Sequence, residues 1–152
     1  MCRSSLATKR LPLGTVALGC ALLVACDASS PATPACGAPR GQVSVAYPAP
    51  NSQNIPDDFS GVIFASTNGL ANSYQAIIVA NGTADVTELN TVVAAAPPFP
   101  TPFATPPFPG PVYQVSTYPN AQPLLGFTPY YVYLNDTNSN CAPTLLSHFT
   151  SH

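Results

Sequence analysis

Charge is scarce in this chain, and tryptophan is absent. The 152 residues include four Lys and Arg and six Asp and Glu, so only 7% are charged while 46% are hydrophobic. A composition this apolar excludes the highly charged, intrinsically disordered class of protein. Proline, by contrast, is abundant, with 19 residues. Because a proline inside a helix costs about 3 kcal/mol, this proline content also excludes a mainly helical fold.

The few cations lie mostly at the N-terminus. Arg3, Lys9 and Arg10 precede a run without charge, residues 11–25. This run is shorter than the roughly 20 apolar residues that span a bilayer, and it has the layout of a secretory signal peptide. We therefore expect residues 1–25 to be an export signal that does not belong to the fold.

The export signal ends in Leu23-Val24-Ala25-Cys26, which resembles the lipobox of bacterial lipoproteins. The resemblance covers residues 1–26, with the cationic region, the apolar core and the cysteine in order. It implies cleavage after Ala25, attachment of diacylglycerol to the Cys26 thiol and further acylation. Two or more acyl chains, at about 0.8 kcal/mol per buried CH₂, anchor a protein stably. The alternative is a secreted protein that is cut elsewhere, in which Cys26 is a spare thiol.

Removal of the signal leaves Arg40 as the one cation of the exported part, against all six carboxylates. A surface with one cation cannot neutralise a row of phosphates, so nucleic-acid binding is excluded. Anionic lipid headgroups would not attract such a surface either. We therefore expect the membrane contact to be covalent, through the lipid on Cys26.

The five cysteines divide in a way that fits export. Cys2 and Cys20 leave with the signal and Cys26 takes lipid, so that Cys36 and Cys141 remain. An even number in an oxidising compartment favours a disulfide, which would stabilise the domain by about 4–5 kcal/mol. The alternative is two buried free thiols. Because the sequence has no C-x-x-C spacing, nothing in it supports a redox or zinc site.

Two segments follow the signal. Residues 26–40 are small, polar and proline-containing, which predicts a short flexible tether. In residues 41–152, β-prone runs alternate with turns of Pro, Asn, Gly and Ser, a pattern typical of an antiparallel β-sandwich. We predict about seven strands. They cover residues 42–47, 61–66, 74–80, 112–118, 130–135 and 144–150, with one strand and a connection in the ambiguous run 83–96.

Residues 97–111 are unusually rich in proline, with Pro97-Pro98-Phe99-Pro100 recurring as Pro106-Pro107-Phe108-Pro109. Proline has no N–H to donate, so this segment cannot join the interior of a sheet. We expect it to be extended, similar to polyproline, and to lie along an edge or a face of the sandwich.

Two stretches of the domain resemble immunoglobulin-like and fibronectin type III domains. Residues 125–134, LGFTPYYVYL, are similar to the entry into strand F of these domains, where a corner tyrosine bonds to upstream backbone. The resemblance assigns the corner to Tyr130. Residues 47–56, followed by the apolar run 62–64, resemble bacterial Ig-like domains of extracytoplasmic proteins. The fold implied is an Ig-like antiparallel β-sandwich, in which Cys36 and Cys141 lie at the same end and can pair.

The sequence offers little for catalysis. Its two histidines, His148 and His152, lie at the C-terminus, and we expect His148 to face solvent beside inward-facing Leu145 and Phe149. Asp57 and Asp58 are neighbours in a turn, so their side chains diverge; a calcium site there is the alternative, although the ligand spacing of a calcium loop is missing. We therefore predict no catalytic residue, no metal and no cofactor.

Aromatic residues are the remaining candidates for binding. They are Tyr113, Tyr118, Tyr130, Tyr131 and Tyr133, with Phe99, Phe103 and Phe108 in the proline-rich segment. Tyrosines on an outer face could stack on sugars or bind a protein, whereas the alternative is cross-strand pairing and packing of Phe and Pro over the sheet.

The sequence favours a non-catalytic binding or structural module of the cell envelope, facing the periplasm or the cell surface, with an envelope protein or a glycan as partner. A carbohydrate-binding or adhesion domain is the second hypothesis, and an envelope hydrolase the third.

Overall fold

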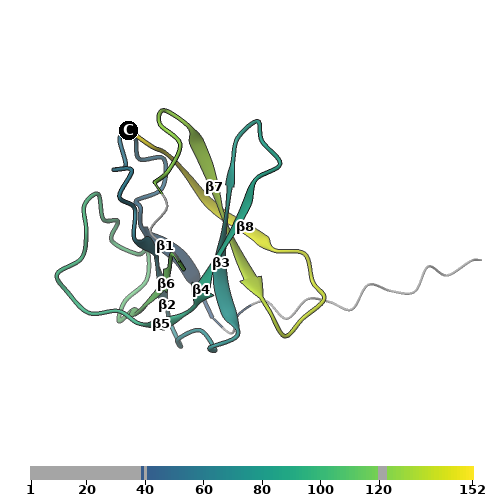
Figure 1. Ribbon diagram of the computed structural model, residues 1–152. Helices are drawn as coiled ribbons and strands as arrows, with labels where there is room; N and C mark the ends of the chain where they lie inside the picture. The colour runs from purple at the N-terminus through teal and green to yellow at the C-terminus, as the bar shows by residue number, and fades with distance from the viewer. Residues whose placement is uncertain (1–38, 40, 120–122) are drawn as a thin grey trace, which may run out of the picture. The chain divides into compact units, whose positions relative to one another are not determined.

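The computed structural model describes residues 39, 41–119 and 123–152 of the chain. These residues form strands and contain no helix, so none of them belongs to a helix that could cross a membrane. The predicted all-β class is confirmed (Figure 1). The predicted export signal, residues 1–25, and two of the predicted functional cysteines, Cys26 and Cys36, lie outside the described residues.

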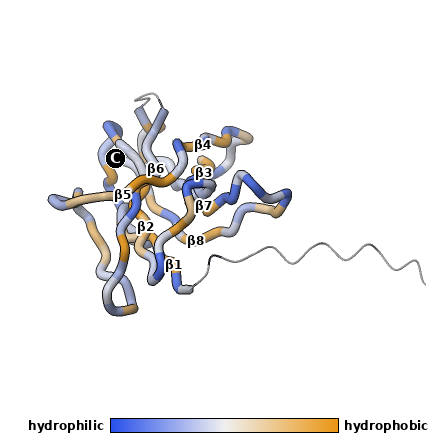
Figure 2. The backbone as a smooth tube through the Cα atoms, turned by 90° about the horizontal axis from the view of Figure 1, so that it is seen from below, coloured by the Kyte–Doolittle hydropathy of each residue, from blue (hydrophilic) through white to orange (hydrophobic). Residues whose placement is uncertain are grey.

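Eight strands form two antiparallel sheets of four, where about seven strands were expected. Sheet one has the order β1-β2-β6-β5 and sheet two the order β4-β3-β7-β8. The strands are β1 (Val43–Tyr47), β2 (Gly61–Ser66), β3 (Tyr74–Ala80), β4 (Val86–Thr91), β5 (Val93–Ala94), β6 (Val112–Thr117), β7 (Pro129–Asp136) and β8 (Thr144–Thr150). Figure 2 shows how hydrophilic turns, such as the β7–β8 connection, separate the strands.

The ambiguous run 83–96 contains two strands in different sheets. β4 pairs with β3 in sheet two, and β5 pairs with β6 in sheet one. Val92, which is fully buried between them, marks the change of sheet, and its N–H donates to the Tyr74 carbonyl oxygen at 2.7 Å. The mixed pattern of the sequence arises because the chain crosses from one layer to the other at this residue.

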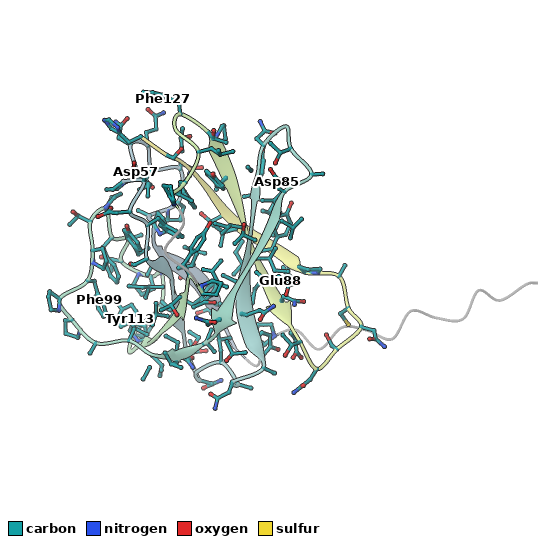
Figure 3. All side chains as sticks on the ribbon, viewed as in Figure 1. Asp57, Asp85, Glu88, Phe99, Tyr113 and Phe127 are labelled. Carbon is teal, nitrogen blue, oxygen red and sulfur yellow. The ribbon has the colours of Figure 1, made fainter. Side chains whose placement is uncertain are left out.

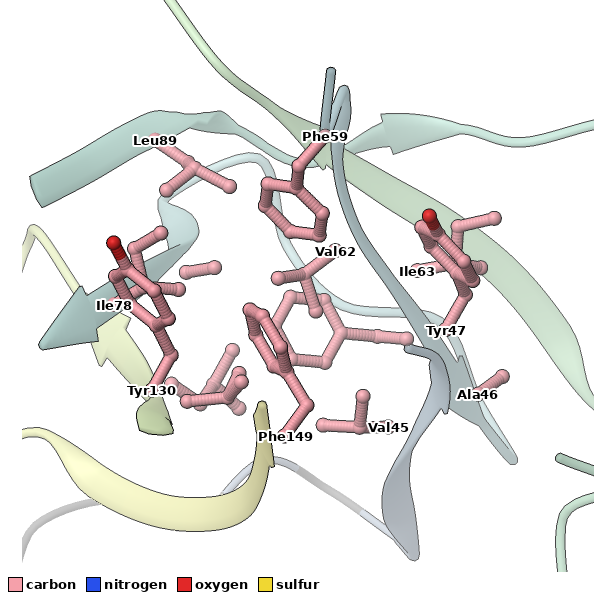
Figure 4. Close-up of a cluster of buried hydrophobic side chains, with 14 of the residues drawn as sticks. Val45, Ala46, Tyr47, Phe59, Val62, Ile63, Ile78, Leu89, Tyr130 and Phe149 are labelled. Atoms are coloured by element: carbon pink, nitrogen blue, oxygen red, sulfur yellow. The ribbon is translucent and has the colours of Figure 1, made fainter. Parts of the chain in front are cut away.

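The core lies between the two sheets and follows the alternation of the strands. Val62 and Phe64 of sheet one are fully buried, as are Ile78 and Val132 of sheet two. Figure 4 shows Val62 and Ile78 in this cluster of buried side chains. An aromatic column joins the two sheets, because Phe149 of β8 stacks on Phe59 and on Tyr130, with ring centroids 5.4 Å apart in both cases. Such pairs add about 0.5–1.5 kcal/mol each to the burial of the rings.

A buried serine connects the layers through hydrogen bonds. Ser116 of β6 accepts the Ala76 N–H at 2.9 Å and donates its hydroxyl to the Asn90 carbonyl oxygen. The register of β3 against β4 shifts between Gln75 and Ile77, and the Ala76 N–H lies at this irregularity. A buried N–H without a partner costs about 1–3 kcal/mol, so the serine hydroxyl replaces the missing strand partner there.

The proline-rich segment runs beside β1 and covers the outer face of sheet one. The Ala104 N–H donates to the Ala46 carbonyl oxygen at 2.8 Å, and the Ala49 N–H donates to that of Pro102 at 3.0 Å. Phe99 and Phe103 stack with centroids 4.7 Å apart, and both rings contact Tyr113 of β6. The expected position along an edge and a face is confirmed. The segment bends at residues 97–98, 101–102 and 107–110, so it does not run straight as polyproline would.

The outer edge of β8, on the side away from β7, is also paired with another segment of the chain. Residues 51–55 run parallel to β8: the Asn51 N–H donates to the His148 carbonyl oxygen at 2.9 Å, and the Ile55 N–H donates to that of Thr150 at 3.1 Å. β8 is therefore hydrogen-bonded on the side that faces away from β7, and β1 accepts one such bond at Ala46.

The expected inward orientation of Leu145 is wrong. Val132 of β7 pairs with Ser147, but Tyr133 pairs with Leu145, so β8 carries an extra residue, Leu146. Such a bulge shifts the alternation by one position. Leu146 packs against the core instead, whereas Leu145 is 52% exposed. Phe149 and His148, beyond the bulge, have the expected inward and outward positions.

Phe149→Ala should lower the free energy of unfolding by about 3–5 kcal/mol, because the ring is 1% exposed and removing it opens a cavity in the aromatic column. Phe127→Ala is the matched control, since that ring is 81% exposed and should change stability by less than about 0.5 kcal/mol. Chemical denaturation of the full chain measures both. Equal losses in the two variants would contradict the assignment of the core.

Candidate functional site

The candidate tyrosines fall into three groups in the structure. Tyr130 points into the core and stacks on Phe149, while its hydroxyl accepts the Leu125 N–H at 2.8 Å. This bond to backbone five residues upstream is the contact that a corner tyrosine makes. Tyr130 therefore fixes the path of the chain into β7 and does not belong to the outer face of sheet two.

Two further tyrosines are covered by other side chains. Tyr113 lies under the stacked rings of Phe99 and Phe103, and Tyr118 packs edge-on against Phe59 with centroids 5.7 Å apart. Burial raises the pKa of Tyr118, and this outweighs its hydrogen bond with Thr87, which lowers it. For Tyr113 and Tyr118, the structure therefore shows ordinary aromatic packing, which was the alternative to a binding role.

Tyr131 and Tyr133 are different, because they lie on the outer face of sheet two. In the register of β3 with β7, Tyr131 pairs with Val79 and Tyr133 with Ile77, so all four side chains lie on the outer face of sheet two. Ile77 is covered by its neighbours there and is only 7% exposed. Because side chains alternate between the two faces of a strand, the burial of Tyr130, Val132 and Leu134 places Tyr131 and Tyr133 on the opposite face.

Aliphatic side chains extend this face on both sides. Val86 of β4 pairs with Val79 and is 58% exposed, and Leu145 of β8 pairs with Tyr133. We call the surface formed by Ile77, Val79, Val86, Tyr131, Tyr133 and Leu145 the tyrosine face. It contains a shallow apolar groove of about 190 Å³, which Pro143 closes at one end. An exposed apolar patch of this kind on a monomer is typical of a binding surface.

Polar groups border the tyrosine face. The Gln75 side-chain amide donates to the Glu88 carboxylate at 3.4 Å, and the His148 ring lies 6.1 Å from that of Tyr131. Apolar area with a polar rim is the general anatomy of protein interfaces. The arrangement can hold a partner by stacking, burial and hydrogen bonds.

Sequence reasoning found the two tyrosines of this face but missed its aliphatic residues. Val86 lies in the run whose strand structure was ambiguous, and Leu145 was expected to be buried. The bulge at Leu146, which exposes Leu145, leaves no signal in the local sequence. Only the pairing of β8 with β7 reveals it.

The remaining predicted positions do not assemble into a site. Asp57 and Asp58 are exposed residues of a turn, His148 is exposed on β8, and His152 ends the chain. Among the described residues, no three His, Cys, Asp or Glu side chains lie close enough together to hold a metal ion. Cys141 belongs to the β7–β8 connection, and its pairing with Cys36 stays a prediction.

Comparisons of this chain with protein-family models, with curated proteins and with solved structures find no match.

Tyr130→Phe should lower the free energy of unfolding by about 1 kcal/mol, because it removes the hydroxyl that accepts the Leu125 N–H and changes no other atom. Tyr131→Phe removes the same atom from the outer face and should leave stability unchanged within error. Denaturation curves of the two variants give the difference. A larger loss in Tyr131→Phe would show that the outer hydroxyl, not the corner bond, matters to the fold.

Proposed function

We propose that this chain is a lipid-anchored lipoprotein of the bacterial cell envelope, and that its domain is a non-catalytic, Ig-like binding or structural module. One observation carries the proposal: the two outer faces of the sandwich differ in how far other segments of the chain cover them. The proline-rich segment packs on Tyr113 of the outer face of sheet one, whereas Val86 and Leu145 of the tyrosine face on sheet two are more than half exposed. A chain that covers one face with its own residues and leaves the other open has a surface for a partner.

The Ig-like assignment rests on two features of the described residues. When the strands are lettered along the chain, with β4 as C′ and β5 as D, the sheets become A-B-E-D and C′-C-F-G, which is the order of the Ig family. The Tyr130 bond then lies at the start of strand F, where the corner tyrosine of that family lies. Both features support the proposal independently of the sequence pattern.

The lipid anchor rests on the lipobox and on the charge of the surface. The described residues include no Lys or Arg, so this part of the chain offers no cation to anionic headgroups. A protein with such a surface needs another means of staying at a bilayer, and the acylation of Cys26 would supply it.

We also propose the disulfide between Cys36 and Cys141. Residues 51–55 run parallel to β8, so the chain that follows β1 advances together with β8. β1 also contacts β8, and Cys141 lies in the connection that leads into β8. Cys36 precedes β1, so this topology supports the pairing.

A carbohydrate-binding or adhesion domain is the second candidate. It is favoured by the two tyrosines of one strand, Tyr131 and Tyr133, next to the hydrogen-bonding side chains of Gln75, Glu88 and His148. Aromatic rings that stack on sugar faces, together with amide and carboxylate groups, suit this chemistry.

Cys26→Ala should abolish the incorporation of labelled palmitate into the protein in cells and release it from the membrane fraction, because the thioether cannot form. Cys36→Ala is the matched control and should still be labelled. Labelling of the Cys26→Ala protein would contradict the lipid anchor while leaving the fold untouched.

A photo-reactive phenylalanine analogue in place of Tyr133 should cross-link the anchored protein to one specific envelope protein in intact cells. The same analogue in place of Val112, which is exposed on sheet one, should not. Equal cross-linking from both positions would contradict a specific surface. If Tyr133 yields no protein and Tyr133→Ala lowers binding on a glycan array, the second candidate takes the place of the first.

A further inference from the structure

A second concave surface lies at one end of the sandwich and meets the tyrosine face at Val86. It is a cavity of about 590 Å³ between the β3–β4 turn and residues 123–125, which precede β7. Ligand pockets for small molecules typically measure about 300–1,000 Å³, so the cavity has room for two or three sugar rings. Its lining includes Asp85, Thr87, Tyr118, Pro123, Leu125 and Tyr130.

The lining of the cavity is polar on one side. The Asp85 carboxylate has no hydrogen-bond or ion-pair partner within the described residues, although its main-chain N–H is fixed by a bond to Thr83 Oγ1 at 3.1 Å. The Thr87 and Tyr118 hydroxyls interact with each other. Burial raises the pKa of Tyr118, so this phenol keeps its proton at neutral pH and can donate it to a ligand. The cavity thus combines the Asp85 carboxylate, which accepts hydrogen bonds, with two hydroxyls.

The opposite wall is held in place by side-chain bonds to the backbone. The Leu125 N–H donates to the Tyr130 hydroxyl, and its carbonyl oxygen accepts the Ser151 hydroxyl. Ser151 Oγ also accepts the Thr128 N–H at 2.9 Å. A wall that is ordered before binding pays little conformational entropy when a ligand arrives.

Phe127 adds an aromatic ring to the same end of the molecule. Figure 3 shows it at this end with Asp85 and Asp57. Its φ of 53° is left-handed, which is uncommon for a bulky residue, and its side chain is 81% exposed. The ring lies beside that of His152, with centroids 6.0 Å apart, and Phe127 is not among the residues that line the cavity.

Charge decides which ligand fits. Because the described residues include no Lys or Arg and the cavity holds the Asp85 carboxylate, an anionic ligand would be repelled. An amine could pair with Asp85 but would leave the Tyr118 hydroxyl proton without an acceptor. A sugar hydroxyl is both donor and acceptor, so it matches all three groups, and a sugar face can stack on an aromatic ring.

We propose that this cavity binds the end of a neutral oligosaccharide, with Asp85, Thr87 and Tyr118 as hydrogen-bonding residues. The site adjoins the tyrosine face at Val86, which lines both, but it does not depend on the lipid anchor or on the partner proposed above.

The test uses the full chain in detergent micelles with ¹³C-labelled tyrosine rings and three neutral probes: chitotriose, cellotriose and maltotriose. The seven tyrosines report their own positions, with signals assigned through single Tyr→Phe variants. At least one probe should shift the ring signals of Tyr118 and Tyr130 and leave those of Tyr131 and Tyr133 unchanged. Oligogalacturonate, which is anionic, should shift none of them.

Asp85→Ala should raise the dissociation constant of that probe about tenfold or more, because a hydrogen bond to a charged group is lost. Glu88→Ala removes a carboxylate from the tyrosine face and should change it less than about twofold. Shifts confined to Tyr131 and Tyr133 would overturn the cavity and favour the second candidate of the proposed function. Binding of oligogalacturonate, or no shift with any neutral probe, would overturn the inference and leave the lipid anchor and the protein partner untouched.

Discussion

The stacking of Phe149 between Phe59 and Tyr130 is the contact on which most of the described features depend. It joins β8 and β7 of sheet two to the loop that enters sheet one. Because Tyr130 points inward to make this contact, its neighbours Tyr131 and Tyr133 must point outward, and the tyrosine face follows. The Tyr130 hydroxyl extends beyond the core to Leu125, so the same residue also fixes one wall of the cavity.

Much of the fold could be predicted because it is local. The runs 61–66, 74–80 and 144–150 have the predicted bounds, since strand alternation and flanking turn residues are sufficient there. The run 83–96 could not be divided from the sequence, because Val92 changes sheets in response to β3 and β6, which lie elsewhere in the chain. Leu145 was misplaced for the same kind of reason, since its bulge is defined only by the partner strand.

The candidate binding surfaces could likewise be predicted only in part, because they depend on segments that are distant in the sequence. Sequence reasoning gathered five tyrosines but could not separate them, because the cover over Tyr113 comes from Phe99 and Phe103 in a distant segment. The cavity was not predicted at all. Its lining comes from the β3–β4 hairpin, the end of β6 and the approach to β7, and no motif in any of these segments signals that they meet. Proximity of this kind follows from topology, not from spacing along the chain.

The hydrogen bonds along the outer sides of β1 and β8 have a consequence for copies of this protein that meet. A sheet edge with unpaired N–H and C=O groups can recruit an identical edge from a neighbouring molecule. Here the proline-rich segment donates a hydrogen bond to β1 at Ala46, and residues 51–55 pair with β8. Within the described residues, the two edges that remain are β5, which has two residues, and β4, which carries Glu88. The short length of β5 and the repulsion between the Glu88 carboxylates of two molecules both oppose strand pairing between molecules. The molecules can therefore be crowded together without aggregating through their strands.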